Sequence, residues 1–427
     1  MRLSELAIVA GFVIAFALVS RRLERTWLTG PMVFVAAGIM LGRAGIDALG
    51  FGMDAGPVRV LAEATLVLLL YTDAIRIDLG LLRQERRLPT RLLLFGLPLT
   101  LMAGTLAAVG LFPDLVLWEA ALVAAILAPT DAALGQAVIA DPRVPGRIRQ
   151  ALNVESGLND GLVVPVITIL VAATAVEVDL EPASYWVTFA LRQVGFGVAA
   201  GVVVGYAGGL LLARFAQRGW VDGAFRQLAT LAIGVGAFAA AELIEGNGFV
   251  AAFVAGLAFG TSARSLGGDA QDFAEDEGHL LSLLTFLAFG AVFAGPALDD
   301  LTWQIAVFAV LSLTVVRMVP VAIGLAGVGL QRATVAYMGW FGPRGLASIL
   351  FALFLVEEAG IPRAADVSLI VTWTVLVSVF AHGLSAVPLT ERYVAVVSRQ
   401  AADDPEHMAV PQMPTRMGDR YASRPGR

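Results

Sequence analysis

Apolar segments that are long enough to cross a bilayer recur along the whole chain and are separated by short polar loops. About 20 apolar residues in an α-helix span the hydrocarbon core of a membrane, and about thirteen segments of this chain meet that length. The predicted spans are residues 3–20, 28–43, 58–75, 91–112, 115–140, 151–176, 185–214, 225–243, 247–263, 280–297, 303–325, 334–356 and 366–388. The pattern therefore predicts an all-α polytopic membrane protein.

Composition agrees with this fold class and excludes several others. The chain is 58% hydrophobic and only 15% charged, whereas soluble domains carry about 25% charged residues. It contains no cysteine, which excludes disulfides and thiolate metal sites. The net charge of -6 is spread over loops and tail without a basic patch, so we expect no nucleic-acid partner.

Arginine placement predicts the orientation in the membrane. Alternate loops carry the arginines, namely the loops at residues 21–25, 76–87, 143–149, 214–226, 264 and 332. The intervening loops hold few arginines and are often acidic. This positive-inside pattern requires an odd number of spans. It predicts a multi-pass protein of the cell (inner) membrane with its N-terminus outside and its C-terminus in the cytoplasm.

Two predicted spans are interrupted at corresponding places. Pro129 breaks the fifth span, and Gly342-Pro343 break the twelfth. Taking spans 1–6 and 8–13 as two halves, with span 7 between them, puts the two breaks at equivalent positions in halves of opposite orientation. Matching interruptions of this kind are typical of inverted repeats with a binding site near the membrane midplane. We therefore predict two inverted six-helix repeats with discontinuous, crossed helices 5 and 12.

Charged side chains gather beside the first break. Asp131 follows Pro129-Thr130, and Glu155, Ser156, Asn159 and Asp160 form one stripe of the next helix because residues four apart share a face. A charge at the centre of a membrane costs about 2.5–3.5 kcal/mol on insertion scales. A kink with Asp131 as a helix cap, or a polar seam between helices, are the structural alternatives. We favour an ion site because Ser or Thr would serve as a cap at lower cost, and Ser and Asn alone would suffice for a polar seam.

Two arginines late in the chain are candidate counter-charges. Arg317 and Arg344 both fall within predicted spans, and a buried arginine must be paired. A pair of Glu155 with Arg317 would leave Asp131 and Asp160 for a transported species. His382 is a further titratable residue, but we interpret it as a hydrogen-bonded histidine near a helix end and leave it out of the main site.

The motifs PTDA (129–132) and VESGLNDG (154–161) resemble those of the monovalent cation:proton antiporter family, in the branch of NhaP and the eukaryotic sodium/proton exchangers. The resemblance extends over residues 1–388 and is supported by YTDA, VVRMVP, FGPRG and AHGLSAVP. It implies a thirteen-helix fold in which a core domain moves against a dimerisation domain. Ala132 departs from the family pattern, in which proline commonly follows the Thr-Asp pair; here the proline precedes that pair.

The resemblance also implies roles for the residues of the site. It maps a monovalent cation and proton site onto Thr130, Asp131, Ser156 and Asp160. Glu155 and Asn159 would hold the core together through Arg317, with Arg344 as a further organising residue. The adjacent Asn159 and Asp160 match the electroneutral branch of the family.

The domain prediction follows from the spans and the resemblance. Residues 1–388 form the transmembrane antiporter domain, with core helices near 91–176 and 303–388 and dimerisation (scaffold) helices near 3–75 and 185–297. Residues 389–427 are polar and contain four prolines, at 405, 411, 414 and 425. This composition predicts a short, disordered cytoplasmic tail.

These observations predict a secondary antiporter rather than an enzyme. The resemblance implies exchange of Na⁺, Li⁺ or K⁺ for H⁺, one for one and in the service of pH homeostasis. Burial favours the neutral form of Asp160, so we expect the two ions to compete for it. We expect no cofactor beyond the transported ions; the partners are membrane lipids and a second copy of the chain. The alternatives are an intramembrane aspartyl protease that uses Asp131 and Asp160, or a cation channel.

Overall fold

The computed structural model describes residues 3–23, 26–49, 55–78, 80, 82, 86–131, 134–139, 141–179, 183–266, 269–357, 361–401 and 404–410. Within these residues every regular element is a helix. The first half contains α1 (Leu3–Leu23), α2 (Gly30–Leu41), α3 (Ala55–Ile75), α5 (Arg87–Arg91), a π-helix (Leu92–Gly96), α6 (Leu97–Leu111), α7 (Leu117–Leu127), α8 (Gln136–Ile139) and α9 (Gly146–Asp179).

The second half begins with the long helix α10 (Ala183–Gln217). It is followed by α11 (Gly223–Glu242), α12 (Gly248–Ser262), a 3-10 turn (Arg264–Leu266), α13 (Asp269–Phe289), a π-helix (Gly290–Ala294), a 3-10 turn (Pro296–Asp300), α14 (Trp303–Leu313) and α15 (Val315–Gly324). The chain continues with α16 (Arg332–Trp340), α17 (Leu346–Glu357), α18 (Ala364–Val397) and a last 3-10 turn (Pro405–His407).

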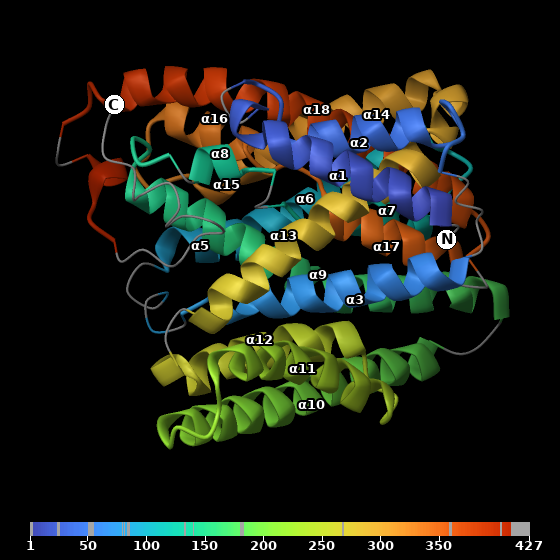
Figure 1. The fold of residues 1–427 in the computed structure, drawn as a ribbon. Coiled ribbons are helices and arrows are strands. Elements are labelled where there is room, and N and C mark those ends of the chain that lie inside the picture. The colour runs from blue at the N-terminus through green and yellow to red at the C-terminus, as the bar shows by residue number, and fades with distance from the viewer. Residues whose placement is uncertain are drawn as a thin grey trace.

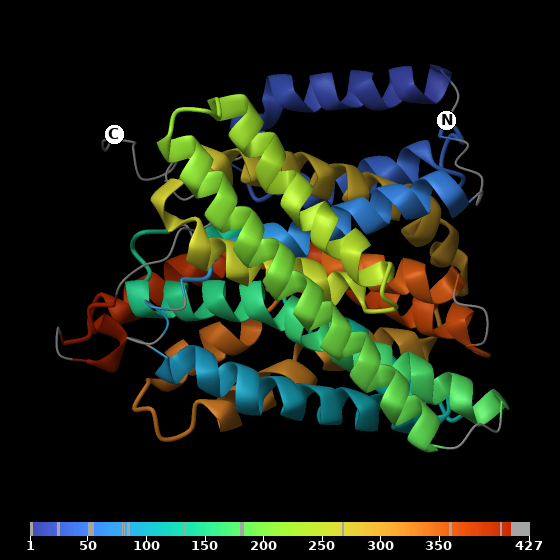
Figure 2. The same cartoon turned by 90° about the horizontal axis from the view of Figure 1, so that it is seen from below.

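The helices lie in layers. Figure 1 shows α10, α11 and α12 as an outer layer, with α3 beside it and the remaining helices stacked beyond. Helix α12 packs between α10 and α3, and α3 also contacts α9. Seen from below, the outer-layer helices cross the others obliquely (Figure 2).

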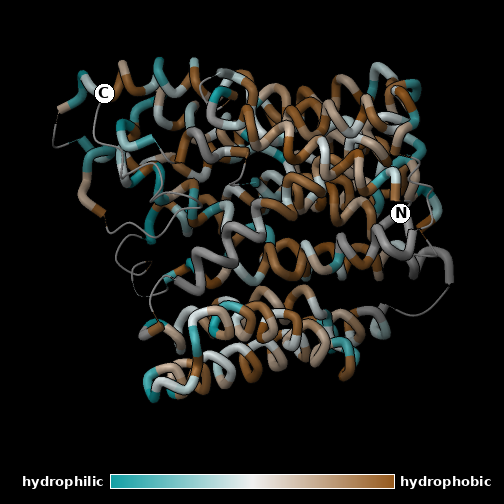
Figure 3. Tube along the Cα trace, viewed as in Figure 1, coloured by the Kyte–Doolittle hydropathy of each residue, from teal (hydrophilic) through white to brown (hydrophobic). Residues whose placement is uncertain are grey.

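Length and hydropathy agree with a membrane protein. Seven helices are long and apolar enough to cross a bilayer, and four shorter apolar helices accompany them in the described part of the chain. Polar residues gather toward the two ends of the bundle, and hydrophobic residues predominate along its length (Figure 3). Each of the thirteen predicted spans overlaps at least one helix of the structure. The number of crossings and the repeat layout remain predictions.

Close approach of α10 to α12 depends on a row of glycines. A Cβ atom would lie 2.7 Å from the Asn247 carbonyl oxygen at Gly197 and 2.6 Å from the Ala251 carbonyl oxygen at Gly201. At Gly205 it would overlap the Ala255 carbonyl oxygen. Small residues at four-residue spacing are typical of tightly packed membrane helices. Here they allow α10 and α12 to pack closely within the outer layer.

The tail differs from the sequence-based prediction. We predicted disorder from residue 389 onward, but α18 continues to Val397, and a 3-10 turn follows at Pro405–His407. The physical reason is side-chain anchoring: Tyr393 is 3% exposed and Glu406 is fully buried. The disorder prediction is therefore wrong for residues 389–401 and 404–410, while 411–427 lie outside the described residues.

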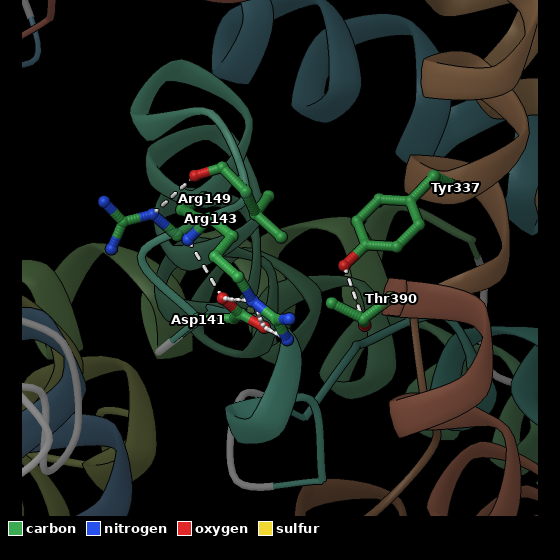
Figure 4. A network of polar contacts seen from close by, with 6 residues as sticks. Asp141, Arg143, Arg149, Tyr337 and Thr390 are labelled. Carbon is green, nitrogen blue, oxygen red and sulfur yellow. Dashed lines mark hydrogen bonds and ion pairs between the residues drawn. The ribbon is translucent and has the colours of Figure 1, made fainter. Parts of the chain in front are cut away.

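The loop between α8 and α9 contains an ion pair outside the predicted spans. Asp141 accepts hydrogen bonds from Arg143, the shortest 2.7 Å long, near Arg149 and the Tyr337–Thr390 hydrogen bond (Figure 4). Partial burial raises the pKa of Asp141, but the hydrogen bonds and charge of Arg143, with the charge of Arg149, outweigh it and lower the pKa.

We expect Asp141→Asn to lower stability at neutral pH but not in acid. Because the folded-state pKa is depressed, the contribution of Asp141 is present above the unfolded-state pKa of about 3.9 and is lost as pH falls through the folded-state pKa. The loss should be below about 1 kcal/mol, because Arg143 is largely exposed. Thermal unfolding in detergent at several pH values measures it. A deficit that persists below both pKa values would contradict this assignment.

Candidate functional site

Two interrupted helices cross at the centre of the molecule. Helix α7 ends at Leu127, and helices α16 and α17 are separated by the non-helical residues 341–345. The Asp131 backbone N–H donates to the Pro343 carbonyl oxygen over 2.8 Å, which joins the two breaks directly. The predicted interruptions at Pro129 and at Gly342-Pro343 are thus both present. Ala132, where the sequence departs from the family pattern, lies outside the described residues.

Asp131 caps the helix that begins at the other break. Its Oδ2 accepts a hydrogen bond of 3.0 Å from the backbone N–H of Leu346, the first residue of α17. A carboxylate at this position satisfies an otherwise unpaired donor and complements the positive end of the helix dipole. The alternative raised from the sequence was that Asp131 caps the second half of its own helix; the helix that it caps here comes from the second break.

Arg344 makes the reciprocal contact. Its guanidinium is fully buried and donates to the carbonyl oxygens of Ala128, at 2.9 Å, and Pro129, at 3.3 Å. These carbonyls terminate α7, where a positive charge complements the negative end of the helix dipole. The first break therefore supplies a carboxylate to the N-terminus of α17, and the second break supplies a guanidinium to the C-terminus of α7.

Helix α18 supports the second break through residues that the sequence did not identify as part of the site. Ser378 Oγ accepts a 2.7 Å hydrogen bond from the Arg344 backbone N–H. His382 Nε2 lies 2.9 Å from the carbonyl oxygen of Trp340, the last residue of α16. His382 is therefore hydrogen bonded at a helix end, as interpreted, but that end belongs to α16. The only signal in the sequence was the motif AHGLSAVP.

The predicted pair of Glu155 and Arg317 is present. Arg317 Nη1 and Nη2 donate to Glu155 Oε1 and Oε2 over 2.6 and 2.8 Å, and both side chains are 3% exposed. Such a bidentate contact fixes geometry as well as charge. The contact joins α15 to α9 next to the second break, since Arg317 also lies against Gly342.

A hydrogen-bonded row of side chains joins the first break to the stripe on α9. Asn159 Nδ2 donates to Thr130 Oγ1 over 2.7 Å, and Thr130 Oγ1 lies 2.9 Å from Ser156 Oγ. Asp160 is one turn beyond Ser156 on the same face of α9 and is 6% exposed. The structure thus brings Thr130, Ser156 and Asn159 into contact and places Asp160 beside them.

Residual exposure divides the site into two groups. Asp131, Ser156 and Asp160 keep 6–8% of their surface exposed, whereas Thr130, Glu155, Asn159, Arg317 and Arg344 keep 0–3%. The first group presents carboxylate and hydroxyl oxygens, which are the donors that hard cations prefer. No cluster of three or more histidine, aspartate or glutamate side chains suited to a metal ion occurs among the described residues.

We expect Gly345→Ala to destabilise the crossing. An added Cβ would overlap the Asp131 Oδ2 atom and lie 2.7 Å from its Cβ and Cγ atoms. Overpacking of this kind costs about 1–3 kcal/mol, so the thermal unfolding temperature in detergent should fall. Gly236→Ala on α11 is the matched control, because a Cβ there meets nothing within 4 Å. Equal stability of the two variants would show that the crossing is not tightly packed around Asp131.

Comparison with known proteins finds a family model and several relatives that match this chain. The family model described as "Sodium/hydrogen exchanger, transmembrane" matches residues 8–392. The K(+)/H(+) antiporter NhaP2 of Shewanella baltica is 24% identical, covering 83% of this chain and 60% of its own. The K(+)/H(+) antiporter NhaP of Alkalimonas amylolytica is 25% identical, covering 87% of this chain and 64% of its own. This chain therefore spans less than two thirds of the length of these relatives.

A solved structure shows the same fold. The sodium proton antiporter MjNhaP1 from Methanocaldococcus jannaschii at pH 8 has a TM-score of 0.72, with 18% identity over 91% of this chain and 99% of its own. The family match covers nearly all of the helical part of the chain, including both breaks and the α9 stripe. The chain belongs to the transmembrane sodium/hydrogen exchanger family.

Proposed function

We propose that this protein is a secondary antiporter that exchanges a monovalent cation for a proton, one for one. The observation that carries the proposal is the crossing at which Asp131 and Arg344 cap each other's helix ends, next to the Thr130–Ser156 hydroxyls and Asp160. Non-helical backbone of this kind is tolerated at membrane depth only where it is enclosed by protein or lines a cavity.

Charge counting supports one-for-one exchange. The region holds the carboxylates of Asp131, Glu155 and Asp160 and the guanidinium groups of Arg317 and Arg344. It therefore has one carboxylate more than it has guanidinium groups. A single proton or a single monovalent cation balances that charge, and a buried site is costly to move through a low-dielectric region while it carries net charge. Reorientation would thus require one ion or the other, which couples the two fluxes.

Asp160 is the carboxylate for which the two ions compete in this proposal. Glu155 is engaged by Arg317 on both oxygens, and Asp131 caps α17. With the cation bound, oxygens of Asp160, Ser156, Thr130 and Asp131 are the proposed ligands. Asn159 and Arg344 would hold the first break in place, and no cofactor takes part.

The cation is proposed as Na⁺, Li⁺ or K⁺. Relatives are named as K(+)/H(+) antiporters in Shewanella and Alkalimonas, and as an Na(+)/H(+) antiporter in Schizosaccharomyces pombe, which is 24% identical to this chain. These names support a monovalent cation as substrate. The family match supports neither the intramembrane protease nor the channel.

The proposal includes a membrane setting and a second copy of the chain. The arginine pattern supports a cell-membrane protein with its C-terminus in the cytoplasm. Large apolar side chains point outward from α1 and α10, for example Leu18 at 82% and Leu191 at 69% exposed, and would meet lipid or a second protomer. A homodimer with a moving core, in the service of pH homeostasis, is the proposed working form.

Flux measurements in proteoliposomes test the function. An imposed pH gradient should drive uptake of Na⁺, Li⁺ or K⁺, and a cation gradient should drive proton movement, at rates that a membrane potential does not change. Cation flux without proton coupling would indicate a channel. Dependence on the membrane potential would contradict one-for-one exchange, and absence of any flux would contradict antiport.

A further inference from the structure

Helices α7 and α16 are the first halves of the two interrupted helices. At the N-terminus of each, the backbone N–H of the N-cap residue donates to an acidic side chain, but the two acids come from different parts of the chain. Helix α7 follows Val116, and Glu119 at its third position accepts a 3.1 Å hydrogen bond from the Val116 backbone N–H. An acid at this position that reaches back to the N-cap amide is one half of a capping box. The acid of α7 is thus local in sequence.

Helix α16 lacks an acid at the matching position. Its N-cap is Gln331, and its third residue is Thr334. The acid comes from the tail instead: Glu406 Oε1 accepts 2.8 Å hydrogen bonds from both the Gln331 backbone N–H and the Thr334 hydroxyl. Glu406 is fully buried, and Glu119 is 1% exposed. The tail therefore completes the α16 cap from 75 residues away.

The turn that carries Glu406 is seated between two elements of the site. The Pro405 carbonyl oxygen accepts a 2.8 Å hydrogen bond from Arg147, which is 3% exposed at the start of α9. Tyr393 on α18 donates to the Thr334 hydroxyl over 3.2 Å. The turn thus links the beginning of α9, which carries Asp160, to the beginning of α16, which leads into the second break; Figure 1 shows it at the end of the molecule where α16 is labelled.

We propose that the turn Pro405–His407 is a working part of the transport unit and that Glu406 is a positioning residue that completes the α16 capping box in trans. Because helix α16 has only nine residues, a displacement of its first turn would also shift its last residue, Trp340. That far end is held by His382 and continues into the break that contains Arg344. The consequence for transport rests on the proposed function; the cap itself does not.

A capping swap tests the proposal. Glu406→Ala removes the acid in trans, and Thr334→Glu in the Glu406→Ala background places an acid in cis, as Glu119 does in α7. A chain that ends after residue 410 is the matched control, because it keeps the turn. Amide hydrogen exchange at residues 331–335 reports the cap without reference to transport, and proteoliposome flux gives the maximal rate and the apparent cation affinity.

Glu406→Ala should speed amide exchange at Gln331 about tenfold or more and lower the maximal transport rate about fivefold or more, because a small displacement at the break is costly. The double variant should restore both to within about twofold, and the control should match the full chain. If Glu406→Ala does not accumulate, accumulation of the double variant alone supports the swap, and loss of both contradicts it.

Three results would overturn the inference. The first is unchanged amide exchange in Glu406→Ala, and the second is faster amide exchange with transport unaffected. The third is a double variant that fails to restore either quantity. Failure of the proposed function is a separate outcome, because the full chain would then show no flux while the amide-exchange difference between variants persisted.

Discussion

Replacement of Asp160 by asparagine should reduce cation–proton exchange to the level of protein-free vesicles while the protein still inserts and folds. Asparagine keeps the size of the side chain but removes the negative charge that binds either ion. Because the side chain keeps its size and stays polar, we expect the variant to insert and fold. Loss of flux would therefore report loss of the binding group.

The measurement compares three chains in the same vesicles. The original chain defines full exchange, Asp160→Asn tests the buried carboxylate, and Asp141→Asn removes a carboxylate that lies outside the predicted spans in an ion pair with Arg143. We expect Asp141→Asn to retain exchange with an unchanged pH profile, because its carboxyl group titrates in the acid range. Measurable proton-coupled Na⁺ or K⁺ flux in Asp160→Asn would refute the competition mechanism.

Arg317→Ala should be the most destabilising single change at the site. It would leave the Glu155 carboxylate buried at 3% exposure without its bidentate partner. Removing one member of a buried ion pair costs about 3–5 kcal/mol because the remaining charge is uncompensated. Packing is also lost, since Arg317 lies against Gly342 in the second break. We expect a large drop in thermal stability and in accumulation of the protein in the membrane.

A double-mutant cycle separates charge from packing. If the uncompensated charge dominates, Glu155→Gln should recover a substantial part of the stability lost in Arg317→Ala, with a coupling free energy of about 0.5–3 kcal/mol. If packing dominates, the two losses should add. Expression and transport that both remain intact in Arg317→Ala would contradict a structural role for the pair.

Much of the architecture could be predicted from local pattern. Apolar length identified a membrane protein with several spans, because the bilayer sets a minimum length that every crossing must meet. Pro129 and Gly342-Pro343 pointed to the interruptions, because proline removes a backbone hydrogen bond of a helix and clashes with the preceding turn. Proline alone does not decide this, since Pro165, Pro320 and Pro388 lie inside continuous helices. The stripe of Glu155, Ser156, Asn159 and Asp160 could be placed on one face because helical periodicity is local. Each of these predictions depends on residues within a few turns of one another.

The tail shows where local pattern misleads. Its prolines and polar residues predicted disorder from 389, and composition alone contains nothing to oppose that prediction. What orders residues 404–407 is a buried carboxylate that meets the unsatisfied N-terminus of α16. The contact stabilises the tail only when the two segments meet in the folded protein, so the sequence of either segment alone does not predict it.

By itself, therefore, the sequence determined that this chain crosses a membrane, that two helices are interrupted, and that costly carboxylates gather beside the first interruption. Periodicity and desolvation are properties of short segments, so these conclusions needed no tertiary contact. Only the tertiary structure decided that Asp131 caps α17, that Arg344 caps α7, and that Glu406 caps α16. A helix end can accept a charge from any segment that folding brings within about 3 Å, and sequence separation does not limit which one it is.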